Sequence, residues 1–171
     1  YAYLMCADQS AADGDKAAAL KMYEELAGDA LPRIQVASFL GRVKAMGEKG
    51  VPIAVEALTG QNADLQSAAL MCVRKMEGKE ATTAFAGVFG KLAVPMQALL
   101  LDALADRGDS AALPAAQEGA KSQDLGVRIA ALEAMGRLGG AACVPELASV
   151  AATGGSKEEK TAAQESLDIL R

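Results

Sequence analysis

Two adjacent pairs of carboxylates, Glu24-Glu25 and Glu158-Glu159, are the residues whose type best suits general acid–base chemistry. Such chemistry needs a carboxyl group whose pKa is raised by burial or by a neighbouring charge. Both pairs stand beside lysines in segments with a helical pattern, so we expect their side chains to face solvent. We therefore interpret them as parts of solvated helix faces and predict no catalytic residue.

Other kinds of active centre lack their essential residues. The sequence contains no histidine, which excludes Ser-His-Asp and Cys-His centres and the usual zinc and iron ligand sets. Neither GxxxxGK[ST] nor GxGxxG, the patterns of phosphate-binding loops, is present. The cysteines, Cys6, Cys72 and Cys143, are far apart in helix-like segments, which indicates small buried thiols. We expect no cofactor, no metal and no enzymatic activity.

Composition and charge narrow the class of protein further. Of 171 residues, 51% are hydrophobic but only 4% are aromatic, so Ala, Leu, Val and Met dominate and favour helix over sheet. A net charge of −5 offers no cationic surface to phosphate backbones, and we expect no nucleic-acid partner. No run approaches the roughly 18 apolar residues that cross a bilayer, and we expect no membrane partner.

The elements that would position any site recur with a period near 31 residues. Apolar residues at i, i+3 and i+6 form the face of one helix in each of several successive segments. These stripes are Leu40-Val43-Met46, Leu70-Val73-Met76 and Leu132-Met135-Leu138, and Leu101-Leu104-Arg107 holds the same positions with an arginine in the third. A glycine follows each stripe and suits a left-handed helix end: Gly47, Gly78, Gly108 and Gly139.

Prolines mark where a second helix begins in most segments. The pairs Val51-Pro52, Leu113-Pro114 and Val144-Pro145 recur in register, and Thr82-Thr83 takes the equivalent place in the remaining segment. Proline is tolerated in the first turn because its missing N–H would have no helical partner there. We predict antiparallel helix pairs at 31–47/50–60, 63–77/79–92, 94–107/110–121 and 125–138/141–152. A further helix begins at the capping-box residues Ser156 and Glu159.

The segment 1–28 lacks this pattern and reads as two helices around Gly14-Asp15. Its GDKAAALKMYEELAG resembles part of a tetratricopeptide unit, although the tryptophan of that pattern is absent. We predict that residues 1–28 form a hairpin that caps a repeat array at residues 29–171.

The repeated unit resembles the HEAT-repeat family, best in its short bacterial variety. The fullest copy spans 124–152, where the D..VR..AL pattern is matched by Asp124, Val127, Arg128, Ala131 and Leu132. Gln66 and Gln97 stand where this copy has Arg128. The resemblance implies an all-α fold, an α-solenoid wound as a right-handed superhelix whose units contact only their neighbours.

The second helices of such a solenoid line its concave surface. If Val144, Leu147, Ala148 and Ala151 face the core, the outward positions repeat through the array, with Ala84, Gly87 and Ala115 as small members. The candidate binding residues are Ile53, Glu56, Lys91, Glu118, Glu146 and Ser149. This surface is mildly acidic and poor in the aromatic residues that dominate tight interfaces. It is either a solvated face or a groove for weak binding of a basic or polar peptide.

Arg107 occupies a stripe position that is apolar in the other segments. It could anchor an acidic group of a partner. Alternatively, its stem packs on the core while the guanidinium reaches solvent or a helix C-terminus. We favour the second, structural interpretation.

The resemblance implies a non-catalytic scaffold, spacer or protein-interaction module, monomeric as a domain, with a protein or peptide partner. The chain opens at YAYLMCADQ without an initiator methionine, so we expect a segment cut from a larger bacterial protein, with the array continuing beyond Arg171. The cytoplasm and an exported or periplasmic location both remain open. The alternative function is a bilin-lyase-like or other ligand-modifying HEAT-like enzyme. A further alternative is an array that only spaces two domains.

Overall fold

The computed structural model describes residues 2–171, and in that range every regular element is helical. The chain divides into two compact units, of which unit 1 ends at Ala81 and unit 2 spans Thr82–Arg171. Unit 1 contains α1 (Ala2–Ala12), α2 (Lys16–Leu26), α3 (Pro32–Met46), α4 (Val51–Thr59) and α5 (Ala63–Lys75). Unit 2 contains α7 (Val94–Arg107), α8 (Leu113–Gly119), α9 (Leu125–Leu138), α10 (Val144–Thr153) and α11 (Lys157–Ile169). The short helix α6 (Lys79–Ala86) includes the boundary.

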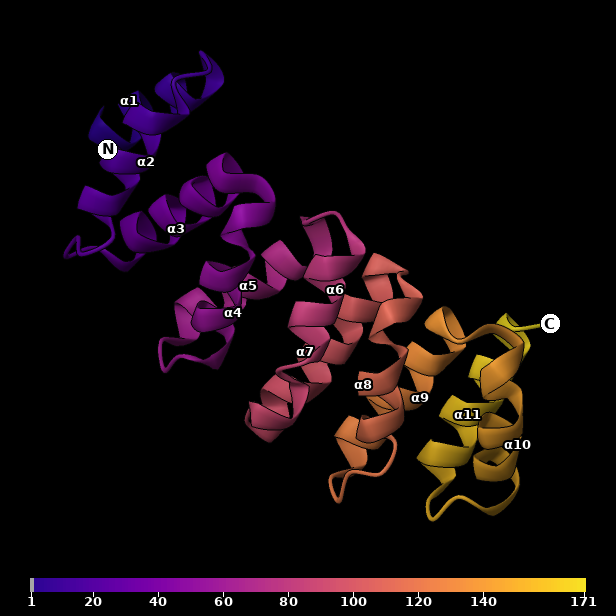
Figure 1. The fold of residues 1–171 in the computed structure, drawn as a ribbon. Coiled ribbons are helices and arrows are strands. Elements are labelled where there is room, and N and C mark those ends of the chain that lie inside the picture. Colours follow the sequence, from indigo (N-terminus) through magenta and orange to yellow (C-terminus); the bar gives the residue numbers. More distant parts are fainter. Residues whose placement is uncertain (1) are drawn as a thin grey trace. The chain divides into compact units, whose positions relative to one another are not determined.

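Within each unit, successive first helices pack on one another, and in unit 2 each second helix packs on the first helix that follows it. In unit 2, α9 contacts α7 on one side and α11 on the other, while α8 packs on α9 and α10 on α11. Figure 1 shows α9, α10 and α11 side by side at the yellow end of the chain. In unit 1, α3 contacts α5, and α2 packs between α1 and α3. This arrangement confirms the predicted all-α fold of the α-solenoid class.

The first helices of the pairs, α3, α5, α7 and α9, begin at Pro32, Ala63, Val94 and Leu125. The period of 31 residues as a structural repeat and the right-handed superhelix stay predictions. The division into a cap at 1–28 and an array at 29–171 also stays a prediction, although α1 and α2 do form a packed pair.

The second helices begin where the prolines indicated. The helices α4, α8 and α10 each carry proline in the first turn, and each follows a short 3₁₀ turn. The helix without proline, α6, ends early at Ala86 instead of continuing to residue 92, and a 3₁₀ turn at Phe89–Lys91 follows it. Glycine disfavours helix interiors, and Gly87 and Gly90 interrupt this stretch.

The left-handed turn after α9 differs from the prediction. Gly47, Gly78 and Gly108 have positive φ as expected, but after α9 the residue with positive φ is Gly140, while Gly139 has a φ of −93°. A Cβ on Gly139 would lie only 2.0 Å from Cys143 Sγ. Gly139 is therefore needed for close packing, and the change of direction falls one residue later.

The core of each unit follows the predicted stripes. Residues Leu101, Leu104, Leu132 and Met135 are all at most 1% exposed. By contrast, Leu40, Met46 and Met76 are only half-buried. The stripe of unit 1 is thus incompletely covered towards the C-terminal ends of α3 and α5, which leaves apolar surface there.

Candidate functional site

A polar side chain in the first turn of each first helix joins that helix to the preceding loop. In unit 1, Gln35 Nε2 donates a hydrogen bond to the Asp29 carbonyl at 2.6 Å, and Gln66 Nε2 donates to the Gly60 carbonyl at 2.9 Å. These contacts satisfy carbonyl groups beyond the end of the previous helix, which lack intrahelical partners.

In unit 2, the first turns of α7 and α9 also bond to the preceding loop. Gln97 Nε2 donates to the Leu92 carbonyl at 3.1 Å, and Arg128 Nη1 donates to the Ser122 and Gln123 carbonyls at 3.0 and 2.9 Å. The glutamines that depart from the arginine of the HEAT-like pattern therefore keep its bond to the loop. They cannot keep its charge.

The positive charge of Arg128 forms an ion pair with Glu159 of α11, the next first helix. Its Nε donates to Glu159 Oε1 at 2.6 Å, and Glu159 Oε2 also accepts from the Ser156 backbone N–H at 3.1 Å. The Glu159 N–H donates to Ser156 Oγ, so the predicted capping box is present. The expectation that Glu159 faces solvent was wrong, because its carboxylate is enclosed by this network. Glu158 is exposed, as expected.

We predict that the contribution of Glu159 to stability depends on pH. The hydrogen bond from Arg128 lowers the pKa of Glu159 below its ordinary value. The ion pair is therefore fully formed above the unfolded-state pKa of about 4.3, and its stabilisation is lost as the pH falls through the lower folded-state pKa. In urea unfolding at neutral pH, Glu159→Gln should be less stable than the native chain, and this difference should shrink in acid. Glu158→Gln is the control, and a pH-independent difference for Glu159→Gln would contradict the assignment.

Arg107 is bound inside its own unit. Its Nε donates to Thr82 Oγ1 at 2.5 Å, and the same hydroxyl donates to Asp109 Oδ2 at 2.7 Å. Thr82 is fully buried and takes the place that Val51, Leu113 and Val144, the residues before proline, hold in the other second helices. The structural role that we favoured for Arg107 agrees with this contact, and a buried hydroxyl is among the partners of its guanidinium.

The candidate binding residues from the second helices fall in different environments. Ile53 is half-buried and lines a small cavity, while Glu56 on the same helix is exposed. In unit 2, Glu118 is exposed and its Oε1 lies over Gly90, so it is close to the turn that carries Lys91. Glu146 is half-buried and Ser149 is exposed, both on α10. A binding surface composed of these residues stays a prediction.

The assumed orientation of the second helices was partly wrong. Leu147 is buried as expected, but Val144 and Ala148 are exposed and Ala115 is buried. A 3₁₀ turn precedes α10 and places Cys143 in the core. The buried face of α10 therefore continues from Cys143 to Leu147, four residues on, and this excludes Val144 and Ala148.

An open groove lies between the C-terminal ends of α3 and α5 in unit 1, with a volume of about 590 Å³. We call it the α3/α5 groove. Its apolar lining is Leu40, Val43, Met71, Cys72 and Met76, and its charged lining is Lys44, Glu48, Lys75 and Glu77. Sequence reasoning missed this groove, although the incompletely covered stripe in α3 and α5 is the signal that could have indicated it.

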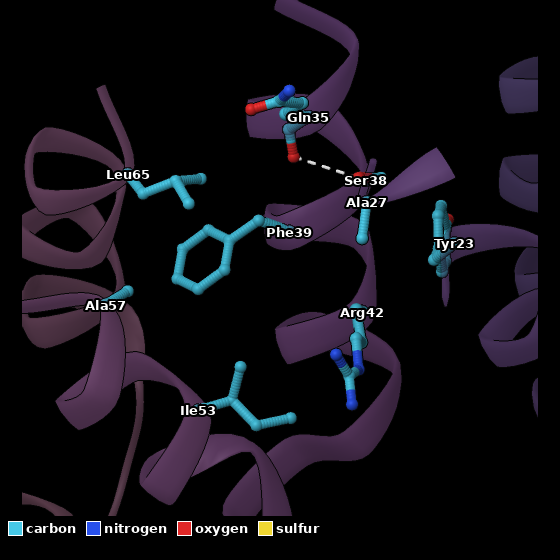
Figure 2. A pocket seen from close by; sticks show the side chains of 9 residues that line it. All are labelled: Tyr23, Ala27, Gln35, Ser38, Phe39, Arg42, Ile53, Ala57 and Leu65. Atoms are coloured by element: carbon cyan, nitrogen blue, oxygen red, sulfur yellow. Dashed lines mark hydrogen bonds between the residues drawn. The ribbon is translucent and has the colours of Figure 1, made fainter. Parts of the chain in front are cut away.

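A smaller cavity of about 170 Å³ lies among α2, α3, α4 and α5, also in unit 1. Figure 2 shows the Phe39 ring directed towards Leu65 and Ala57, with Ile53 and the Arg42 guanidinium alongside. Tyr23, also in the lining, donates a hydrogen bond to Asp8 Oδ1 at 2.6 Å. Burial raises the pKa of Tyr23 to about 12, so its hydroxyl is neutral at physiological pH.

The cysteines differ in exposure. Cys72 and Cys143 are buried as predicted, but Cys6 is exposed, because it lies on the outer face of α1. Burial raises the pKa of Cys72 to about 11 and also raises the pKa of Cys143. Both thiols are therefore protonated and poorly nucleophilic at neutral pH.

Among residues 2–171, cysteine and acidic side chains form no group of three or more that could hold a metal ion. Over the same described range, none of the helices has the length and apolar character needed to cross a membrane.

Comparison with known families identifies the repeats of unit 2. Residues 94–168 match the family model described as HEAT repeats. The match extends from the first residue of α7 almost to the end of α11, and for these residues it confirms the resemblance. No curated protein matches the chain.

Proposed function

We propose, with the HEAT repeats of residues 94–168 as the premise, that the chain is a non-catalytic protein-interaction module. HEAT repeats commonly mediate contacts between proteins. We further propose that the α3/α5 groove binds an amphipathic helix of a partner protein. The observation that carries this proposal is the apolar lining of an open groove of about 590 Å³ between the ends of two helices.

The floor of the groove is suited to an apolar side chain. Met71 is 45% exposed, while Leu40 and Met76 are half-buried, so a docked leucine or phenylalanine would remove apolar surface from water. Methionine is unbranched and adapts to different partner side chains. This composition favours recognition of an apolar stripe rather than of one particular residue.

The rim of the groove favours a helix with flanking charges of both signs. Lys44 and Lys75 are exposed in the last turns of α3 and α5, and Glu48 and Glu77 lie just beyond these helices. A helical segment presents apolar residues at i, i+3 and i+4 towards a groove and charged residues at its edges. We therefore expect a partner helix with one apolar stripe bordered by an acidic and a basic residue.

Selection of displayed random peptides against the chain tests this proposal. Peptides with a helical apolar stripe should be enriched, and Met71→Glu should weaken their binding at least about tenfold, because a carboxylate would be desolvated in the groove. Leu99→Glu is the matched control, since Leu99 is 49% exposed but lies on α7 in unit 2. Its binding should equal that of the native chain.

The same peptides distinguish the groove from the surface suggested by the second helices. Charge reversal of Glu56, Glu118 and Glu146 to lysine should leave binding unchanged if the groove is the site. Loss of binding in this triple variant with full binding by Met71→Glu would overturn the groove assignment. Failure to enrich any helical peptide would overturn it as well.

A further inference from the structure

The lining of the α3/α5 groove contains two methionine thioethers. Met71 is 45% exposed and Met76 is half-buried, and both contribute to the apolar lining. Peroxides oxidise a thioether without prior loss of a proton, so access decides which methionine reacts. Met135, in the core of unit 2, is 0% exposed. The groove therefore presents methionine sulfur to dissolved oxidants in a way that the core does not.

The thiol in the same groove, Cys72, is a poorer target for oxidation. The thiolate is the form of cysteine that attacks a peroxide. Cys72 is only 6% exposed, and burial raises its pKa to about 11, so the thiol stays protonated at neutral pH. An oxidant that enters the groove therefore reacts with the exposed Met71 before it reacts with Cys72.

Lys75 is placed to hold the oxidised form of Met71. It follows Met71 by four residues on α5, so the two side chains lie on the same side of that helix. Lys75 is exposed and also lines the groove. A thioether is a weak hydrogen-bond acceptor, but a sulfoxide is polar and its oxygen accepts readily. The Lys75 ammonium can donate to this oxygen and keep the oxidised side chain at the rim.

We infer that Met71 is a reversible oxidation site that turns off partner binding by the α3/α5 groove; this role rests on the function proposed above. The Met71 sulfur attacks one oxygen of hydrogen peroxide, the S–O bond forms as the O–O bond breaks, and the second oxygen leaves as hydroxide and takes up a proton to become water. Sulfur loses the two electrons that the peroxide gains. A sulfoxide reductase reverses the change with two electrons from a pair of thiols and releases water.

Oxidation changes what the groove recognises. In the reduced form, an apolar side chain of the partner packs on the Met71 thioether and on its apolar neighbours Leu40 and Val43. In the oxidised form, the same contact would bury the polar S–O group, which must first give up its water. The oxidised groove should therefore bind an apolar stripe much more weakly.

Peroxide treatment of the full chain, followed by peptide mass spectrometry, tests the chemistry. Met71 should be oxidised at least about tenfold faster than Met135, because only Met71 is accessible. Chain oxidised at Met71 should bind the selected helical peptides about tenfold more weakly than reduced chain. Treatment with methionine sulfoxide reductases of both stereospecificities should restore the affinity.

Two variants assign the effect to Met71. Met71→Leu keeps the apolar lining without sulfur, so it should bind the peptides like the native chain and keep this affinity after peroxide. Met5→Leu is the matched control, since Met5 is 69% exposed but lies on α1, whose residues do not line the groove. It should stay as sensitive to peroxide as the native chain. Equal loss of binding in Met71→Leu would overturn the assignment.

The dye anilinonaphthalene sulfonate separates the oxidation site from the proposed partner. It binds exposed apolar surface, and Lys44 and Lys75 can pair with its sulfonate. Its fluorescence should fall on oxidation of the native chain but not of Met71→Leu. If no helical peptide is enriched, the proposed function fails, yet this loss of dye binding would still establish Met71 as the switch. Peptide and dye binding that are both unchanged by oxidation would overturn the switch alone.

Discussion

Leu101→Ala is expected to lower the free energy of unfolding by about 2–5 kcal/mol, the cost of removing a large side chain from a closed core. Leu101 lies on α7 and is 1% exposed. Its Cδ1 packs so closely on α8 that a Cβ added to Gly119 would lie only 2.9 Å from it. Because neighbouring helices enclose it, the structure cannot close the space without moving α8. The lost contacts and the remaining cavity both contribute.

Leu99→Ala provides the matched control on the same helix. Leu99 is 49% exposed, so the same chemical change should alter stability by no more than about 0.5 kcal/mol. Urea unfolding followed by far-UV circular dichroism measures both variants. Equal losses for the two would mean that the stripe through Leu101 is not the core of unit 2.

The fold was predictable because its signals are local. Pro52, Pro114 and Pro145 each fall in the first turn of a second helix, where their missing N–H costs nothing. Ser156 and Glu159 form their capping box within three residues. Such features depend on φ, ψ and short-range hydrogen bonds, which neighbouring residues determine.

Features that depend on contacts between helices were missed. Glu159 seemed solvent-facing because its sequence neighbours are charged, yet its partner Arg128 lies in the previous first helix. Within the described residues, the buried Arg42 Nε, which lacks a hydrogen-bond partner, is a second such feature, since residues of α2, α4 and α5 line the same pocket as Arg42. No periodicity of a single helix reveals which polar atoms its neighbours leave unpaired.

The prediction of which residues of the short second helices face the core was also partly wrong. The second helices are only 7 to 10 residues long, and a 3₁₀ turn precedes α4, α8 and α10. Before α10 this turn supplies a buried residue, Cys143, while Val144, the first residue of the helix, is exposed. Which side chains form the predicted surface through Glu118 and Glu146 therefore depends on the register of these short helices. The buried faces of the longer first helices are less sensitive to register.

Gly136→Val is expected to disrupt the packing of α11 on α9 and to lower the free energy of unfolding by about 3 kcal/mol, at the upper end for overpacked cores. A Cβ on Gly136 would lie 2.7 Å from Ser166 Cβ and 2.9 Å from Ser166 Cα. The Cα belongs to the backbone of α11, so no change of rotamer relieves the overlap. Separation of the helices would also break the hydrogen bond from Ser166 Oγ to the Leu132 carbonyl.

Gly126→Val on the same helix is the control, because Gly126 is exposed and its Cβ would meet only the Asp124 carboxylate, at 3.2 Å. We expect it to change stability by less than about 1 kcal/mol. Adding Ser166→Gly to Gly136→Val should restore part of the loss, since the two sites are in contact and couple. Hydrogen exchange of the α11 amides gives the decisive measurement. Native protection of α11 in Gly136→Val would show that the two helices do not pack this closely.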